Sequence, residues 1–236
     1  MVPIERLTAE AREHRLKTGR PLVTLSYAQS LDGSIAAQPG RPLALSGPQS
    51  LRLTHQLRAA HAAILVGIGT VLADDPQLTV RLVEGVSPQP VVLDSRLRTP
   101  LDSRLMQNPL KPWIATFQDT DPTKKAQLER RGARVFPLPA SEQGGVSLPA
   151  TLAMLAGQGL DSLMVEGGVK VIGAFLSQKL ADLLVLTVAP VFVGGLHIRM
   201  PEGSEFPAQA GRFPRLNEMS CEILGDDLVV WGRLGD

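Results

Sequence analysis

Short apolar runs alternate with segments of helical periodicity along almost the whole chain. This alternation is typical of a layered α/β fold with a largely parallel sheet. Near the end, residues 221–224 and 228–231 flank Gly225-Asp226-Asp227, which predicts a terminal hairpin and therefore a mixed sheet. We expect strands over residues 22–30, 63–67, 91–94, 113–116, 133–136, 162–166, 183–189 and 228–233.

Capping signals between these runs predict where the helices begin and end. Ser46-Gly47-Pro48-Gln49 combines a capping-box pair with a proline in the first turn, and this helix should end near Ala60. Two further helices are expected from Asp121 to Gly132 and from Ser147 to Gly157 or Gly159, each begun by a capping side chain and stopped by glycine.

The chain has no internal repeat and no low-complexity linker, so one main domain is the default interpretation. Residues 21–236 form this domain, and residues 1–20 form a helical extension. Charged residues occur throughout residues 4–17, which leaves no apolar core for a signal peptide. Three segments rich in proline and glycine, 84–90, 137–145 and 201–214, are expected to be surface loops.

Composition restricts the possible partners. The 236 residues are 44% hydrophobic, enough for a sizeable core, yet the longest apolar runs are too short or too interrupted for the roughly 20 residues that cross a bilayer. We therefore expect a cytoplasmic protein without a membrane partner. The 24 basic and 23 acidic residues are spread along the chain and give a net charge of +1, so a nucleic-acid partner is not indicated.

Metal binding is not expected either. The single Cys221 excludes an intramolecular disulfide and a cysteine-rich zinc site, and we expect it to be buried as a small hydrophobic residue. The four histidines show no ligand-like spacing of i and i+4 among themselves.

A glycine pair marks the first candidate site. Val165-Glu166-Gly167-Gly168 leads from an apolar strand directly into a helical stretch, residues 169–180, and so places a carboxylate beside a helix N-terminus. Unpaired N–H groups and the helix dipole favour phosphate at such a place. A tight turn is the commoner explanation of such a pair, but a second glycine motif, Gly67-Ile68-Gly69-Thr70, also follows an apolar strand and adds weight to a ligand site.

A Rossmann dinucleotide site is the first alternative for that second motif, because Gly67-x-Gly69 follows a strand and Asp94 ends a later one. It fails on two counts. Leu72 stands where the third glycine belongs, and Pro76 cuts the following helix after about two turns.

Six motifs occur in a fixed order along the chain: Ser30-Leu31-Asp32-Gly33, His55-x-x-Arg58, residues 64–81, residues 92–98, Val165-Glu166-Gly167-Gly168 and Ala189-Pro190. Together they resemble the reductase family of riboflavin biosynthesis, whose bacterial form is the RibD C-terminal domain. The resemblance covers residue 21 to the C-terminus. It implies a dihydrofolate-reductase-like α/β/α sandwich with a mixed, mainly parallel sheet, a homodimer, and NADPH as the cofactor that reduces the ribosylamino group of a pyrimidine 5′-phosphate to ribitylamino.

The resemblance also implies roles for individual residues. Asp74 and Glu166 are the candidate catalytic residues, Asp74 by handling a proton. Substrate contacts are implied for Arg58, Leu78, Arg81 and Glu166. Cofactor contacts are implied for Ala28, Gly67, Gly69, Thr70, Asp74, Ser95, Gly167, Gly168, Val169, Lys170 and Val171.

Each role has a structural alternative. Asp74 in Ala73-Asp74-Asp75-Pro76 is also compatible with a turn residue that caps backbone N–H groups, and Thr70 with an N-cap. Leu78 is equally compatible with a position in the hydrophobic core. Arg58 and Arg81 are also compatible with exposed positions where water solvates the charge. Glu166 is alternatively paired with N–H groups of the next helix.

One segment departs from the family pattern, because Pro42 and Ala44 stand where the family often has a serine for the substrate and a tryptophan or arginine beside the cofactor. The substrate therefore stays open between the diaminopyrimidinone, the deaminated uracil and another small molecule such as a dihydropterin. A non-catalytic nucleotide-binding partner is a further alternative. A single cysteine cannot supply the zinc deaminase signature, so the resemblance implies a standalone reductase.

Overall fold

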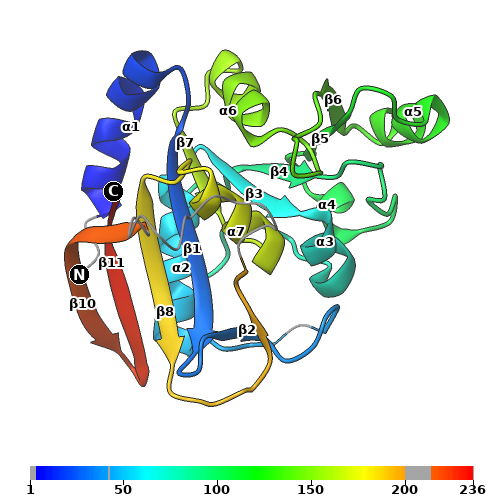
Figure 1. Ribbon diagram of the computed structural model, residues 1–236. Helices are drawn as coiled ribbons and strands as arrows, with labels where there is room; N and C mark the ends of the chain where they lie inside the picture. The colour runs from blue at the N-terminus through cyan, green and yellow to red at the C-terminus, as the bar shows by residue number, and fades with distance from the viewer. Residues whose placement is uncertain (1–3, 42, 200–213, 236) are drawn as a thin grey trace.

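The computed structural model describes residues 4–41, 43–199 and 214–235. Within them, nine strands form one sheet in the order β10-β11-β8-β1-β7-β3-β4-β5-β6 (Figure 1). All neighbours from β8 to β6 are parallel, whereas β11 is antiparallel to β8 and β10. The strands are β1 (Leu22–Ser30), β3 (Ala63–Gly67), β4 (Gln89–Leu93), β5 (Trp113–Phe117), β6 (Arg134–Leu138), β7 (Ser162–Val165), β8 (Leu183–Ala189), β10 (Arg215–Leu224) and β11 (Asp227–Gly235).

Helices cover both faces of the sheet, with α7 in front and α2 behind in Figure 1. Alternate residues of β1 enter different cores: Val23 packs in the cluster that includes α6 and α7, and Leu22 packs in the cluster that includes α1 and α2. The predicted α/β/α sandwich is therefore confirmed. The helices are α1 (Ile4–Thr18), α2 (Pro48–Ala60), α3 (Ile68–Asp74), α4 (Arg104–Gln107), α5 (Pro122–Arg130), α6 (Leu148–Gly157) and α7 (Val169–Ser177).

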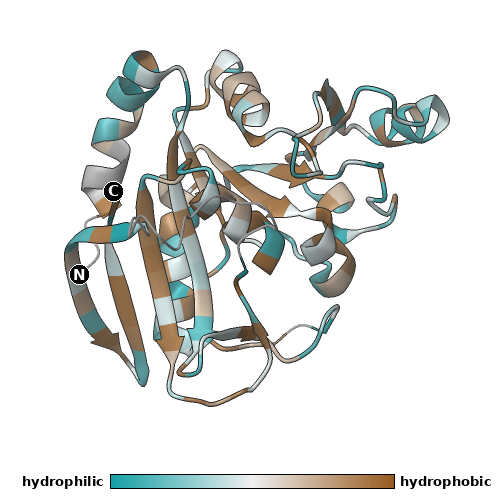
Figure 2. Ribbon diagram, in the orientation of Figure 1, coloured by the Kyte–Doolittle hydropathy of each residue, from teal (hydrophilic) through white to brown (hydrophobic). Residues whose placement is uncertain are grey.

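The central strands are apolar because both of their faces are covered. All five residues of β3 are buried, as expected for a parallel strand between two helical layers. In β8, buried and half-buried residues alternate. Figure 2 shows the hydrophobic residues concentrated in the sheet, while α1 and α5 at the periphery are largely hydrophilic.

Two arginines, Arg15 on α1 and Arg20 just after it, pair with carboxylates beside the sheet. Arg20 donates two hydrogen bonds of 2.7 Å to the carboxylate of Asp182, which also accepts one from the backbone N–H of Val23. Arg15 pairs with Asp161. In the part of the chain that the structure describes, no helix is long and apolar enough to span a membrane.

Asp121 and Ser147 cap their helices as predicted, whereas the predicted cap at Ser46 is wrong. The N-cap of α2 is Gly47, and no side chain caps this helix. The backbone N–H of Gly47 instead donates to the carboxylate of Asp227, at 2.7 Å. Asp227 is also the first residue of β11 rather than part of the hairpin turn, because it pairs with Leu224.

Several other boundaries and exposures differ from the predictions. Helix α7 ends at Ser177, before the predicted Leu180, because Lys179 adopts a left-handed φ of 52°. Cys221 is exposed on the outermost strand β10 and not buried. Strand β6 includes Pro137, which an edge strand tolerates.

Three short elements were not predicted. Strands β2 (Ser34–Ala36) and β9 (Leu196–His197) pair with each other in a small separate sheet, and α4 covers only one turn. The expected loop at residues 201–214 lies outside the described residues except for Pro214, and Pro42 lies outside them as well.

Candidate active site

The predicted cofactor residues lie at one edge of the sheet. Strands β1, β7, β3, β4 and β5 are consecutive neighbours, and their parallel direction places all their C-terminal ends at this edge (Figure 1). Ligands of open parallel sheets bind outside such an edge. The edge carries Ala28 on β1, Gly167 and Gly168 after β7, Gly67 to Thr70 from β3 into α3, and Ser95 after β4.

The two glycine motifs pack against each other. A Cβ on Gly67 would lie 2.8 Å from Cγ2 of Val171, and one on Gly167 would lie 3.1 Å from Cα of Val66. These two glycines therefore allow α7 to approach β3 closely. At Gly168, φ is +76°, and a Cβ there would lie 3.2 Å from the hydroxyl of Thr70.

Gly69 differs from these three glycines because a Cβ added there would lie more than 4 Å from every other described residue it could meet, and Gly69 itself is exposed. Thr70 lies in the first turn of α3, whose N-cap is Gly67, so Thr70 is not an N-cap. Val169 and Lys170 begin α7, and Lys170 is exposed. The backbone N–H groups in the first turn of α7 favour a phosphate at this end of the helix.

Arg58 and Glu166 form an ion pair. Nε and Nη2 of Arg58 each donate a hydrogen bond of 2.6 Å to the Glu166 carboxylate, and the two side chains are only 11% and 13% exposed. Burial lowers the pKa of Arg58, but the charge and hydrogen bonds of Glu166 outweigh it and raise the pKa. Glu166 is thus paired with a guanidinium rather than with N–H groups of α7.

Helix α2 also holds the segment that carries Arg81. Nη1 of Arg58 donates to the carbonyl of Thr79 at 3.0 Å, and Nδ1 of His55 accepts from the backbone N–H of Arg81 at 2.9 Å. His55 is 1% exposed, and burial, together with the charges of Arg58 and Arg81, lowers its pKa to about 4. It therefore stays neutral and keeps Nδ1 as an acceptor.

The Arg81 guanidinium is exposed, although Arg58 and His55 hold the backbone of its segment. Nη1 donates to the hydroxyl of Thr79 at 2.7 Å, and the other guanidinium nitrogens make no hydrogen bond with a described residue. Burial and the nearby charges of Arg58 and Arg104 lower the pKa of Arg81. Two positive charges, one paired and one open, therefore lie at the same end of α2.

The two aspartates that end α3 have different surroundings. Asp75 adopts a left-handed φ of 40° and its carboxylate accepts from the backbone N–H of Arg104 at 2.8 Å, so Asp75 is the turn and capping residue. Asp74 accepts no hydrogen bond from the described residues, and partial burial raises its pKa. The capping alternative for Asp74 is therefore not supported.

Leu78 occupies a core position. It is 2% exposed, has a φ of 54°, and packs with Ile68 and Val71 of α3. It thus fixes the segment between Asp74 and Arg81. Ala44, at the position that departs from the family pattern, is exposed.

A carboxylate that had no assigned role joins two loops near the end of β1. Asp32 accepts hydrogen bonds from the hydroxyls of Ser30 and Ser34, at 2.6 and 2.8 Å, and from the backbone N–H groups of Val193 and Gly194, at 2.9 and 2.8 Å. These bonds, that of Ser30 above all, lower its pKa. The sequence signal was the motif Ser30-Leu31-Asp32-Gly33, but two of the four partners of Asp32, Val193 and Gly194, lie about 160 residues later.

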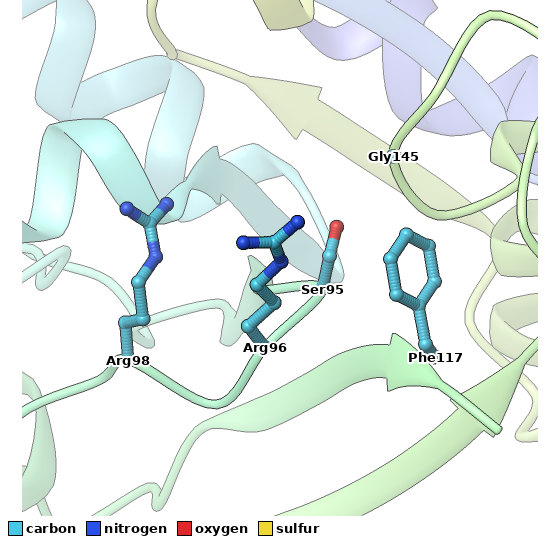
Figure 3. A pocket seen from close by; sticks show the side chains of 5 residues that line it. All are labelled: Ser95, Arg96, Arg98, Phe117 and Gly145. Atoms are coloured by element: carbon cyan, nitrogen blue, oxygen red, sulfur yellow. The ribbon is translucent and has the colours of Figure 1, made fainter. Parts of the chain in front are cut away.

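A cavity opens at the ends of β4 and β5 (Figure 3). It has a volume of about 290 Å³ and is lined by Ser95, Arg96, Arg98, Phe117 and Gly145. Among the described residues, no group of three or more His, Cys, Asp or Glu side chains is arranged to hold a metal ion. The C-terminal ends of these strands thus bring together glycines, arginines and Asp74, which has no hydrogen-bond partner among the described residues.

The chain is similar in sequence to known reductases and riboflavin biosynthesis proteins. A reductase of Methanothermobacter thermautotrophicus, named 2,5-diamino-6-ribosylamino-4(3H)-pyrimidinone 5′-phosphate reductase, is 36% identical over 214 residues, which are 89% of this chain and 97% of the relative. RibD of Actinobacillus pleuropneumoniae is 34% identical over 92% of this chain, but the chain spans only 58% of that protein.

The fold matches as well. The solved structure of Acinetobacter baumannii RibD aligns with a TM-score of 0.80 and 26% identity over 96% of this chain and 62% of that one. The family model of the RibD C-terminal domain matches residues 21–230. The chain therefore belongs to the RibD C-terminal domain family.

Proposed function

We propose that this chain uses NADPH to reduce the ribosylamino group of a pyrimidine 5′-phosphate to a ribitylamino group in riboflavin biosynthesis. The observation that carries the proposal is the contact of the two glycine motifs, which brings the first turn of α3 to the N-terminus of α7. An archaeal relative that this chain covers almost completely is named 2,5-diamino-6-ribosylamino-4(3H)-pyrimidinone 5′-phosphate reductase. Residues 21–236 are the proposed reductase domain and residues 1–20 an extension of it.

The residues at the edge fit a dinucleotide. Gly168 has the backbone conformation and Gly69 the open space that a close phosphate requires, and the N–H groups at Val169 and Lys170 begin a helix. When bound, NADPH would supply a hydride to the sugar carbon that carries the amino nitrogen. All remaining steps concern protons and positions, which the side chains of this chain provide.

Asp74 is the proposed proton donor. Opening the ribose ring breaks the bond between the ring oxygen and the sugar carbon; the oxygen takes a proton and the nitrogen gives one up, so that a neutral imine forms. Hydride addition to the sugar carbon then leaves the electron pair of the imine bond on nitrogen, which takes the one net proton that the reaction consumes. Partial burial raises the pKa of Asp74, which favours the protonated acid that this chemistry needs.

Glu166 and Arg81 are proposed to hold the two ends of the substrate. The Arg58 guanidinium fixes the Glu166 carboxylate, whose remaining lone pairs accept hydrogen bonds from the amino and ring N–H groups of the pyrimidine. The exposed Arg81 guanidinium offers its open nitrogens to the 5′-phosphate. Leu78 is proposed to shape the substrate site between Glu166 and Arg81. It does so by packing in the core and fixing the segment from Asp74 to Arg81.

The test is turnover by the purified chain. NADPH oxidation is followed with three substrates in turn: the diaminopyrimidinone phosphate, the deaminated uracil phosphate and a dihydropterin. We expect oxidation with at least one pyrimidine phosphate and none with the dihydropterin. Oxidation with the dihydropterin alone would reassign the substrate, and NADPH binding without oxidation of any would leave a nucleotide-binding partner instead of an enzyme.

We also propose that the chain acts as a homodimer in the cytoplasm, as the family resemblance implies. Light scattering at micromolar concentration should give twice the chain mass of 25.3 kDa. A fully active monomer would contradict the dimer.

A further inference from the structure

A second open cation lies close to Arg81. Arg104 is exposed at the start of α4, and its guanidinium forms no hydrogen bond or ion pair with a described residue. Along with burial and the charge of Arg58, the charge of Arg104 lowers the pKa of Arg81, so the guanidinium groups of Arg81 and Arg104 are near enough to repel each other. Glu166 compensates the charge of Arg58. Among the described residues, no acidic side chain pairs with Arg81 or Arg104.

Helix α4 is bonded to the segment that leads to Arg81. The backbone N–H of Arg104 donates a hydrogen bond of 2.8 Å to the carboxylate of Asp75. At the other end of α4, the side-chain amide of Asn108 donates to the backbone carbonyl of Gln77. Arg104 therefore lies beside the turn from which the chain continues to Arg81.

The segment between the two arginines is also held by packing. Leu105 of α4 is fully buried and belongs to the same hydrophobic cluster as Leu78. On the side of α2, Nδ1 of His55 accepts a hydrogen bond from the backbone N–H of Arg81. Arg81 and Arg104 thus start from fixed backbone positions, and less conformational entropy is lost when their side chains bind one ligand.

A phosphate group suits two open guanidinium groups better than a carboxylate does. A phosphate monoester carries nearly two negative charges at pH 7, so it compensates both cations, and its three free oxygens can accept from both guanidinium forks. A carboxylate brings one charge and two oxygens. The proposed substrate carries such a phosphate at its 5′ position.

We propose that Arg104 binds the 5′-phosphate of the substrate together with Arg81, and that this pair selects the phosphorylated substrate over the dephosphorylated one. The inference rests on the proposed function, which supplies the phosphate and assigns Arg81 to it. It adds Arg104 as the second cation and gives α4, a single turn outside the sheet, a part in substrate recognition.

Titration with a fragment of the substrate tests the inference without turnover. Ribose 5-phosphate carries the phosphate but lacks the pyrimidine, and ribose lacks both. Wild-type protein should bind ribose 5-phosphate more tightly than ribose. Arg104→Gln should lose roughly tenfold to a hundredfold in affinity for ribose 5-phosphate, the range for a hydrogen bond to a charged group. NADPH affinity should change by less than about threefold, because Arg104 is not part of the proposed cofactor site.

The ionisation of the bound phosphate provides a second readout. The second pKa of a phosphate monoester is about 6, and nearby positive charges lower it. In ³¹P NMR titrations, ribose 5-phosphate bound to the wild type should therefore have a lower phosphate pKa than the free compound. Arg104→Gln should move this pKa back toward the free value, whereas Arg104→Lys, which keeps the charge, should retain most of the shift. Equal phosphate pKa values in the two variants would contradict the contact.

A control variant and the pattern of outcomes complete the test. Arg130→Gln removes the same charge from an exposed position on α5 and should leave both affinities unchanged. If the wild type binds ribose 5-phosphate no better than ribose, or if Arg104→Gln keeps full affinity for it or loses NADPH affinity equally, the inference alone is overturned. Binding of ribose 5-phosphate that depends on Arg104, without turnover of any pyrimidine phosphate, would uphold the phosphate site and overturn the function.

Discussion

The guanidinium of Arg58 is fixed on the carboxylate of Glu166 by two hydrogen bonds of 2.6 Å, across 108 residues of sequence. Because both groups are largely buried, removing one of them leaves the other charge without a partner. We expect Glu166→Gln to lower the free energy of unfolding by about 3 kcal/mol, as measured by urea denaturation.

A double replacement separates the structural role of this pair from its role in binding. Arg58→Met with Glu166→Leu exchanges the ions for apolar side chains of similar volume, and such exchanges are often neutral for stability. We expect near wild-type stability and no turnover. An active double variant would show that Glu166 does not hold the substrate.

His55 is expected to act by positioning Arg81. His55→Ala removes the acceptor for the Arg81 backbone N–H and should raise KM for the phosphorylated substrate while NADPH affinity stays constant. His55→Asn should restore most of the KM, because an amide oxygen takes the place of Nδ1. Equal loss in both variants, or loss of NADPH affinity, would argue for general destabilisation instead.

The same histidine predicts a pH dependence of stability. Its pKa in the folded chain is about 4, below the ordinary value of 6.5, so folding favours the neutral form. The contribution of the neutral His55 imidazole to the free energy of unfolding is fully present above pH 6.5 and is lost as the pH falls through 4. The stability difference between wild type and His55→Asn should therefore shrink between pH 6.5 and 4 in denaturation experiments. A constant difference would contradict the burial of a neutral imidazole.

Gly69 and Gly168 give a matched pair for locating the cofactor. Gly69→Ala places a methyl group in open space and replaces a poor helix former in α3, so stability should rise by up to about 1 kcal/mol. NADPH affinity should nevertheless fall, because that space is the proposed path of the cofactor. Gly168→Ala should lose both stability and affinity, since φ there is +76°. Unchanged affinity in Gly69→Ala would move the cofactor away from α3.

Asp74 is expected to matter for turnover alone. Asp74→Asn keeps the size but removes the acid, so kcat should fall by roughly two or more orders of magnitude while the melting temperature and NADPH affinity stay near wild type. Wild-type kcat should decline as the pH rises through the raised pKa of Asp74, because the protonated form is lost. Near-normal activity with reduced stability would make Asp74 a turn residue after all.

Local signals predicted much of the fold. Strands β1, β3 and β8 begin and end where the apolar runs do, and Asp121 and Ser147 cap their helices as expected. Strands β2 and β9 escaped prediction because they are two or three residues long and exist only through their pairing. Ser46 failed as a cap because Asp227, distant in sequence, binds the start of α2.

The site was predicted as a set of residues but not as a set of contacts. Family motifs named Arg58, Glu166 and Arg81, yet nothing local indicates that Arg58 pairs with Glu166 or that His55 holds the backbone of Arg81. Likewise, the two glycine motifs gave no sign that Gly67 is small to accommodate Val171. Contacts between segments 26 to 108 residues apart depend on the sheet order, which a single sequence does not determine.

Transfer of an isotopic label tests the central claim most directly. NADPH with deuterium at both positions of nicotinamide C4 is incubated with the purified chain and the ribosylaminopyrimidine 5′-phosphate, and the product is analysed by mass spectrometry. We expect a ribitylamino product with one deuterium, located on the sugar carbon bonded to nitrogen. A product without deuterium, or no product from a folded chain that binds NADPH, would contradict the proposed reduction.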